Sequence, residues 1–360
     1  MAPYFTDTFG NAASPHTFGR TASSAVARAR EQIALTIGAD STGIIFTSGA
    51  TEANNLALLG LARGGTGRRK IVVSAVEHKS VLLPADILTE DGFFIEYLPV
   101  DKDGVLVLDV AKRIIDTNTL VVFAQAANNE TGVIQPVKEV AEIAHSFGAL
   151  CHCDAAQAMG KIPVNVSDLD VDLASFSAHK TYGPKGVGVL FAHSILARPR
   201  LRPLVLGGSQ EGRLRAGTLN VPGIVGFGAA CRLASKYLRD DTLRISRLRG
   251  LCEENLLRSI PGARINGRAA PRLPGTISVT IPGVPADVLL ANLQTVCIGV
   301  GAACNSGAPE PSHVLLAMNV NREDAECTVR ISLGRYTTDR DVGACIDEVS
   351  LVAQRLLAGV

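Results

Sequence analysis

Four short stretches of the sequence hold residues whose types and spacing could support catalysis. The first is the stretch FTSGATEAN from Phe46 to Asn54, in which an apolar run ends, a turn of small residues follows and a helix begins. Free N–H groups at the start of a helix, together with the helix dipole, favour a phosphate or a carboxylate. Many turns of this kind only connect two elements, so this stretch alone leaves anion binding and a structural turn open.

The second stretch is Ser177-Ala178-His179-Lys180, at the end of another apolar run. Alternate side chains of a strand share a face, so Ser177 and His179 are expected to point to one side. Lys180 would follow where the chain leaves the strand, and a lysine there could form a Schiff base if burial favoured its neutral form. The alternative is an ordinary lysine in an exposed loop.

The third stretch places Asp154 and Gln157 after an apolar run, one helical turn apart, so that both could face a ligand. A carboxylate at a strand end can pair with a protonated pyridine nitrogen, but the same aspartate could simply cap a helix. The adjacent Cys151-His152-Cys153 resembles part of a metal site. Neighbouring strand residues face opposite sides, however, and no second ligand pair has metal spacing, so we predict no metal site.

The fourth stretch is the glycine-rich segment 301–307, which contains Cys304. The other seven of the eight cysteines fall within apolar or helical stretches, and most are expected to be buried. An accessible thiol in a loop is a candidate nucleophile, and its alternative is an incidental surface cysteine.

The elements that must position these residues alternate between short apolar runs and longer helical patterns. The expected strands are 44–47, 71–76, 93–98, 120–124, 149–153, 173–177 and 186–191, and helices are expected between them at 52–61, 79–88 and 137–147. This order predicts an α/β fold with a mostly parallel, seven-stranded sheet. Ligands of such sheets bind beyond the carboxyl ends of the strands.

The pattern changes near residue 237, where a smaller α+β unit is expected to begin. Its predicted elements are helices at 240–258, 286–295 and 340–357 and strands at 275–281 and 328–333. We therefore predict a large domain, 1–237, and a small domain, 238–360, that carries Cys304.

Composition narrows the classes of function. The 360 residues are 47% hydrophobic and 19% charged, with a formal net charge of +1, so a strongly basic nucleic-acid binder is excluded. The apolar runs are too short to span a bilayer, and the first residues do not form a secretory signal. Eight cysteines without a CxxC pair favour a reducing cytoplasm.

Together these features resemble the cysteine desulfurases (NifS/IscS-like), which are class V, fold-type I enzymes that use pyridoxal 5'-phosphate (PLP). The resemblance runs over nearly the whole chain. The segments that carry it are 9–14 (FGNAAS), 47–52 (TSGATE), 77–78 (EH), 128–132 (NNETG), 154–157 (DAAQ), 177–186 (SAHKTYGPKG), 215–222 (RAGTLNVP), Cys304, 310–313 (EPSH) and 330–335 (RISLGR).

The resemblance implies roles around PLP for several residues of these segments. Lys180 would hold the coenzyme covalently and later move protons at the substrate Cα, and Asp154 would keep the pyridine nitrogen protonated. Gln157 would bond the ring hydroxyl, while His78 would stack on the ring and assist proton transfer. The phosphate would be held by Ala50, Thr51, Ser177 and His179, and by Thr218 of the partner subunit in a homodimer.

The resemblance also implies the reaction. Asn129 and Arg330 would bind the carboxylate of L-cysteine, and the Cys304 thiolate would attack its sulfur. The products would be L-alanine and a persulfide on Cys304, which passes sulfur to an acceptor protein. The acceptor could serve iron–sulfur assembly, tRNA thiolation or DNA phosphorothioation, without direct binding of nucleic acid or membrane by this chain.

Three alternatives remain at this stage. The chain could be a class V aminotransferase or a selenocysteine lyase, or a weakly active scaffold that only docks sulfur acceptors. The scaffold gains support because the strand with which the family usually opens is absent before Met1, and we expect an internal start or a truncation there.

Overall fold

The computed structural model describes residues 1–300 and 311–359. The chain forms two compact units, each described separately. Unit 1 comprises residues 1–98, 108–126 and 136–238, and unit 2 comprises 99–107, 127–135 and 239–360. No helix in the described ranges is both long and apolar enough to cross a membrane.

Unit 1 is built on a seven-stranded sheet in the order β1-β7-β6-β5-β4-β2-β3. Neighbours from β3 to β6 run parallel, and β7 is antiparallel to both β6 and β1. The strands are β1 (Ile44–Thr47), β2 (Lys70–Ser74), β3 (Phe94–Leu98), β4 (Thr119–Phe123), β5 (Leu150–Asp154), β6 (Leu173–Ser177) and β7 (Gly188–Ala192). The predicted mostly parallel α/β sheet is confirmed.

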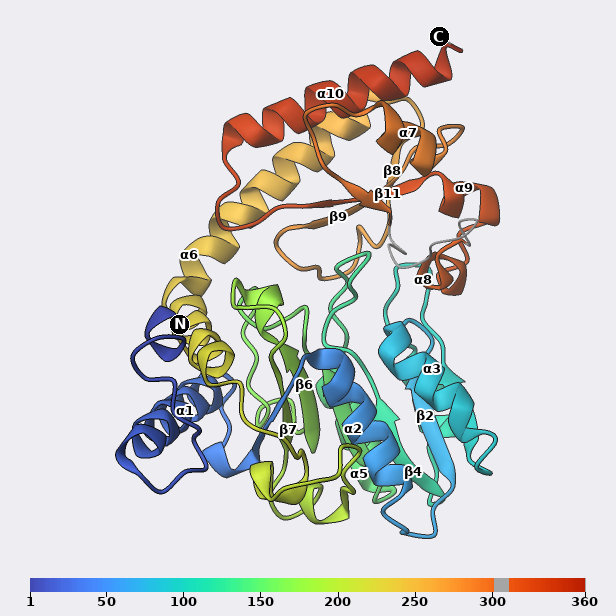
Figure 1. Ribbon diagram of the computed structural model, residues 1–360. Helices are drawn as coiled ribbons and strands as arrows, with labels where there is room; N and C mark the ends of the chain where they lie inside the picture. Colours follow the sequence, from blue (N-terminus) through green and yellow to red (C-terminus); the bar gives the residue numbers. More distant parts are fainter. Residues whose placement is uncertain (301–310, 360) are drawn as a thin grey trace. The chain divides into compact units, whose positions relative to one another are not determined.

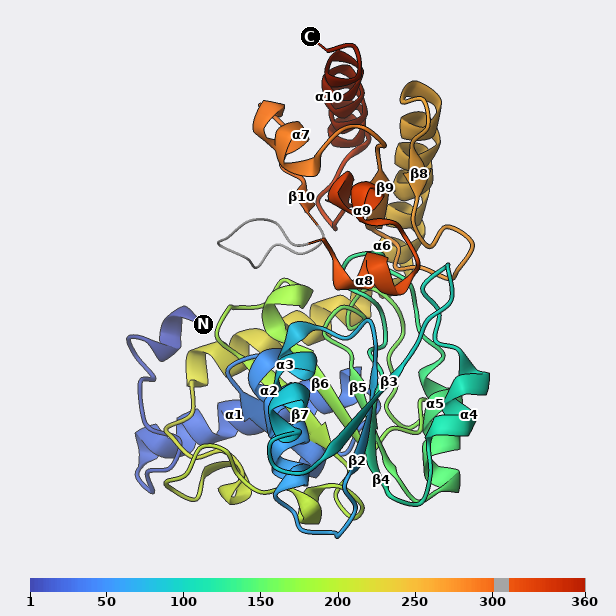
Figure 2. The same ribbon diagram turned by 90° about the vertical axis from the view of Figure 1, so that its right-hand side faces the viewer.

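Helices cover both faces of this sheet because its strands are apolar on both sides. Helices α2 (Ala50–Ala62) and α3 (Lys79–Leu88) lie on one face, and α4 (Leu108–Ile114) and α5 (Val137–Ser146) lie on the other (Figure 2). All strands except the edge strand β3 are buried along their whole length. Helix α1 (Thr17–Thr36) is capped by His16, whose side chain accepts a hydrogen bond from the Gly19 N–H.

Unit 2 contains a four-stranded antiparallel sheet in the order β10-β11-β9-β8. Its strands are β8 (Arg264–Ile265), β9 (Thr276–Thr280), β10 (Gly299–Val300) and β11 (Thr328–Ser332). Its helices are α7 (Ala286–Asn292), α8 (His313–Ala317), α9 (Arg322–Glu326) and α10 (Asp339–Leu357). Apolar residues of α10 and of the second half of α6 (Val221–Ser259) form one core with β9 and β11 (Figure 1).

Helix α6 corrects the predicted helix at 240–258, because it starts at Val221. Pro222 and Gly223 gave this start the appearance of a loop. A proline in the first helical turn costs no hydrogen bond, since the N–H groups there have no partner within the helix. Helix α7 ends at Asn292, before the predicted residue 295.

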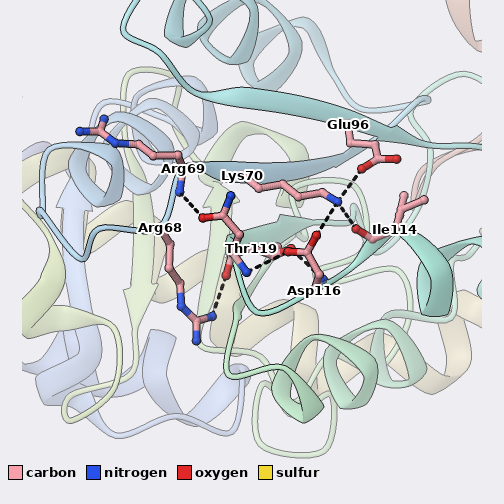
Figure 3. A network of polar contacts seen from close by, with 8 residues as sticks. Arg68, Arg69, Lys70, Glu96, Ile114, Asp116 and Thr119 are labelled. Carbon is pink, nitrogen blue, oxygen red and sulfur yellow. Dashed lines mark hydrogen bonds and ion pairs between the residues drawn. The ribbon is translucent and has the colours of Figure 1, made fainter.

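Ion pairs of the buried Lys70 hold the edge of the large sheet at which its parallel strands begin (Figure 3). The Lys70 ammonium, at the start of β2, contacts Glu96 Oε2 at 2.6 Å and Asp116 Oδ2 at 3.1 Å. It also donates to the Ile114 carbonyl oxygen. Asp116 in turn accepts a hydrogen bond from the Thr119 hydroxyl at 3.3 Å, so β2, β3 and the turn before β4 are tied together.

We expect Lys70→Met to lower the free energy of unfolding by about 1–3 kcal/mol, because it leaves the Ile114 carbonyl and two carboxylates without this donor. Glu96 and Asp116 are partly exposed, which favours the lower end of that range. Lys112→Met is the matched control, because Lys112 pairs with Asp109 on the exposed surface, and it should cost less than about 0.5 kcal/mol. Equal effects in urea unfolding would contradict this account.

A second charged contact at the same edge involves His145, in the last turn of α5. Its Nδ1 lies 3.2 Å from Asp170 Oδ2, and its Nε2 lies 2.9 Å from Oδ2 of the buried Asp172. Partial burial by itself lowers the pKa of His145, but the hydrogen bond and charge of Asp172, with Asp170, outweigh it and raise the pKa above its ordinary value.

Because the pKa of His145 is raised in the folded state, its contribution to stability is full below the ordinary imidazole pKa of about 6.5 and is lost as pH rises through the raised value. We therefore expect the unfolding free energy of the wild type to fall more between mildly acidic and mildly alkaline pH than that of His145→Gln. Parallel pH profiles of the two proteins would contradict this assignment.

Candidate active site

The strands β1 and β6 end together at the opposite edge of the large sheet. Thr47 at the end of β1 and Ser177 at the end of β6 both pair with Gly188 of β7. A Cβ atom on Gly188 would lie only 2.5 Å from the Gly49 Cα, so the turn after β1 packs directly on β7. This close approach brings the start of α2 beside Ser177.

Helix α2 begins at Ala50, two residues before the predicted start, and Gly49 is its N-cap. The first N–H groups of a helix have no partner within it, so those of Ala50 and Thr51 belong to an anion-binding end. The Ser48 N–H instead donates to Glu52 Oε2 at 2.8 Å, and Glu52 pairs with Arg215 at 2.8 Å. Glu52 and Arg215 thus hold the turn through Ser48, and the N–H groups of Ala50 and Thr51 remain for a ligand.

Ser177 and His179 lie together, although not by strand alternation. The strand ends at Ser177, and residues Ala178–Thr181 form a 3₁₀ helix, which corrects the alternation prediction. The Ser177 Oγ lies 2.9 Å from His179 Nδ1. Burial, followed by the charges of Lys180 and Lys185, lowers the pKa of His179. Lys180 is exposed in this turn, which follows β6, the strand next to β5 in the sheet.

Asp154 is buried at the end of β5, with donors on both carboxylate oxygens. Its Oδ1 accepts from the Ala156 N–H at 2.9 Å, and its Oδ2 accepts from Asn54 Nδ2 at 2.8 Å. Turns rather than a helix follow, so the helix-capping alternative and the helical spacing to Gln157 are both wrong. Gln157 lies within these turns, where its Oε1 accepts from Lys161 Nζ at 2.7 Å.

Glu77 is a second buried carboxyl group near Asp154. Burial, and next the charge of Asp154, raise the pKa of Glu77 well above its usual range. Its Oε1 accepts the Gln125 N–H at 2.5 Å. The raised pKa favours the neutral form of Glu77, which places no second negative charge in this buried region beside Asp154.

His78 directly follows Glu77 in the sequence and is half-buried at the N-cap of α3. Its Nδ1 accepts from the Ser80 N–H at 3.1 Å and lies 2.8 Å from the Ser80 Oγ. Ser80 also accepts from Asn54 Nδ2 at 2.8 Å. His78 and Asp154 are therefore joined through Asn54 and Ser80, to which sequence reasoning gave no role.

In unit 2, Asn129 and Arg330 lie together. The Arg330 Nη1 donates to the Asn129 carbonyl oxygen at 2.8 Å, and its buried Nε has no hydrogen-bond partner among the described residues. The preceding side chain, Asn128, accepts the N–H groups of Glu130 and Thr131 at 2.8 and 2.9 Å, which shapes this turn. The guanidinium thus keeps donors for a carboxylate.

The remaining predicted residues are placed as follows. Thr218 is exposed in the loop before α6, and Cys304 lies outside the described residues. All seven described cysteines are free; six are buried, but Cys297 is exposed, which corrects its predicted place within an apolar or helical stretch. No cluster of three or more potential metal ligands occurs within residues 1–300 and 311–359, and the buried His152 contacts the Ser175 Oγ at 2.8 Å.

Comparisons with known proteins agree with this geometry. The "Aminotransferase class-V" family model matches residues 1–345. A "Cysteine desulfurase IscS" from Dictyoglomus turgidum is 42% identical over 99% of this chain and 90% of its own length. A human "Cysteine desulfurase" is 41% identical over 99% of this chain and 78% of its own length. A solved "NIFS-LIKE PROTEIN" superposes with a TM-score of 0.90 and 36% identity, covering 98% of this chain and 94% of the other.

The chain therefore belongs to the class V aminotransferase family, whose fold is that of the fold-type I PLP enzymes. Within it, the chain belongs with the cysteine desulfurases, which use PLP.

The residues described above fit PLP in three respects. Asp154 offers a buried carboxylate for the pyridinium nitrogen, and the start of α2 with Ser177 and His179 offers donors for a phosphate. Lys180 supplies an exposed amine in the same turn as His179, after the strand next to β5. Asn54 lies inside the first motif, so the sequence could have suggested a role for it. The spacing of Asn54 and Ser80 in the sequence, however, does not predict that they contact each other.

We expect Gly188→Ala to weaken PLP binding about tenfold, because the added methyl group must displace Gly49 and with it the start of α2. Gly343→Ala, in α10, meets open space and is the matched control. Both are measured by titrating the protein with PLP, with urea unfolding to confirm that each variant is folded. Unchanged PLP affinity in folded Gly188→Ala would contradict the assigned phosphate site.

Proposed function

We propose that this protein removes sulfur from L-cysteine, releasing L-alanine and leaving a persulfide on Cys304. The observation that carries the proposal is the edge where β5 and β6 end, which places the doubly hydrogen-bonded Asp154 one strand away from the turn with Lys180. The identity of 42% to a cysteine desulfurase over nearly the whole chain supports it. An aminotransferase would need the same coenzyme residues but no thiol nucleophile.

PLP, when bound, withdraws electrons from the substrate Cα and so weakens its C–H bond. In the proposed mechanism Lys180 accepts the proton from Cα, while Asn129 and Arg330 bind the substrate carboxylate. The thiolate of Cys304 then attacks the substrate sulfur. A sulfur–sulfur bond forms as the Cβ–S bond breaks, the electron pair left on Cβ takes a proton, and Lys180 returns a proton to Cα to give alanine.

Other residues hold the coenzyme in this proposal. Asp154 keeps the pyridine nitrogen protonated, Gln157 bonds the ring hydroxyl, and His78 stacks on the ring. The phosphate is bound by Ala50, Thr51, Ser177 and His179. Exposure of Thr218 supports a role outside its own subunit, at the phosphate of a partner in a homodimer.

Sulfur would then pass from Cys304 to an acceptor protein, either an iron–sulfur scaffold or another thiolation protein. Seven free cysteines among the described residues support a reducing compartment, which we propose is the cytoplasm.

The proposal predicts that L-cysteine with a reductant gives alanine and sulfide in equal amounts. Cys304→Ala should reduce sulfide release to the level of the protein-free reaction, because no thiolate can take the sulfur. Lys180→Ala should lose both products. Cys297→Ala is the matched control, since Cys297 is the exposed cysteine among the described residues, and it should keep wild-type rates.

Three outcomes would contradict the proposal. Full sulfide release by Cys304→Ala would exclude its thiol as the acceptor. Amino transfer to a keto acid by the wild type, without sulfide, would identify an aminotransferase instead. A protein that cannot be loaded with PLP would favour the scaffold.

A further inference from the structure

Two side chains that lie outside the coenzyme-binding set connect His78 to Asp154. Asn54, on α2, uses its Nδ2 group twice: it donates to Asp154 Oδ2 and to Ser80 Oγ, each at 2.8 Å. The Ser80 Oγ lies 2.8 Å from His78 Nδ1. Asn54 is fully buried and Ser80 is 8% exposed, so water does not compete for these bonds.

The donor and the acceptor of each hydrogen bond between Asp154 and His78 follow from the groups involved. A carboxylate only accepts, so the Asn54 side chain must turn its NH₂ group toward Asp154, and the second hydrogen then reaches Ser80. Ser80 Oγ accepts that hydrogen and keeps its own for His78 Nδ1. The Ser80 N–H donates to the same nitrogen at 3.1 Å. An Nδ1 that accepts twice carries no hydrogen, so neutral His78 has its hydrogen on Nε2.

The amide of Asn54 is not explained by packing. Its Oδ1 is buried and has no hydrogen-bond partner in the described part of the chain. An unpaired buried oxygen costs stability, so an apolar side chain of similar size would suit a purely structural position better. What the asparagine supplies is the pair of N–H donors, one to each neighbour.

We propose that Asn54 and Ser80 are positioning residues that couple His78 to Asp154. They hold the Asp154 carboxylate and the His78 ring in mutually dependent orientations, with the hydrogen of His78 on Nε2, before PLP binds. The proposal rests on the proposed function for one point, that His78 and Asp154 contact PLP. The coupling itself is a property of this chain's own side chains.

The direct test measures an NMR resonance of His78 while residues 54 and 80 are changed. In the full-length protein without PLP, labelled with ¹⁵N-histidine, the Nδ1 resonance of His78 is assigned by its loss in His78→Gln. We expect that resonance to move in Ser80→Ala and to move in the same direction in Asn54→Leu, although residue 54 does not contact His78 in the described bonds. Ser80→Thr, which keeps the hydroxyl, should restore the wild-type position.

A purely structural role would give a different result. Asn54→Leu would then change the urea midpoint but leave the His78 Nδ1 resonance where it was, and that outcome would overturn the proposal. Ser80→Ala removes a single oxygen, so it keeps the test decisive if Asn54→Leu does not fold: in protein labelled with ¹⁵N-asparagine, the side-chain NH₂ resonances of Asn54 must then shift. Ser146→Ala, whose hydroxyl donates to the Ile143 carbonyl on α5, is the control and should change neither.

PLP titration tests the consequence for the coenzyme. Ser80→Ala should weaken PLP binding about tenfold, as loss of a supporting contact behind a ligand-binding side chain commonly does. The double variant with Asn54→Leu should be no weaker than the worse single variant, because both break one chain of bonds. A moved Nδ1 resonance with unchanged PLP affinity would overturn the positioning role. Failure of the wild type to bind PLP would contradict the proposed function, while the resonances would still decide the coupling.

Discussion

A carboxylate buried at the end of a strand needs a hydrogen-bond donor on each oxygen, and the site depends on how Asp154 meets this requirement. One donor is the backbone of the turn after β5, and the other is Asn54 on α2. Asn54 is in place only because α2 packs its apolar residues on the sheet, in the core shared by Leu56 and Leu61. The packing of α2 on the sheet therefore also orients the Asp154 carboxylate.

The two ends of the parallel strands in the large sheet differ in function. Where the parallel strands begin, ion pairs from Lys70 (Figure 3) and from His145 tie strand starts and turns together. Where they end, polar groups face outward, and Lys180 and His179 are exposed. Gly188 links the two strand ends at the proposed phosphate site, because only a residue without Cβ lets Gly49 approach so closely. Rigid anchoring at one edge leaves the other free to hold a ligand.

The sequence predicted the large sheet well, because its strands are continuous apolar runs between polar turns. β1 and β6 begin and end at the predicted residues, and α3 does as well. The start of α6 was missed because proline and glycines in a first helical turn resemble a loop. The turn at Gln157 was missed because a spacing of three residues fits a turn as well as a helix.

The candidate site was predicted as separate residues, and the structure adds the links between them. Asn54 and Ser80 are 26 residues apart on different helices, so no local pattern relates them. Their relation comes from the packing of α2 against α3. The same holds for Glu77, whose pKa is raised by burial and by Asp154, which follows on another strand.

The identity of the amine that holds the coenzyme tests the central claim most directly. The PLP-loaded protein is reduced with borohydride, which makes a covalent link between PLP and an amine permanent, and is then mapped by peptide mass spectrometry. The account predicts one adduct per chain, on Lys180. An adduct on the neighbouring Lys185 or on any other lysine, or a loaded protein without an adduct on Lys180, would contradict it.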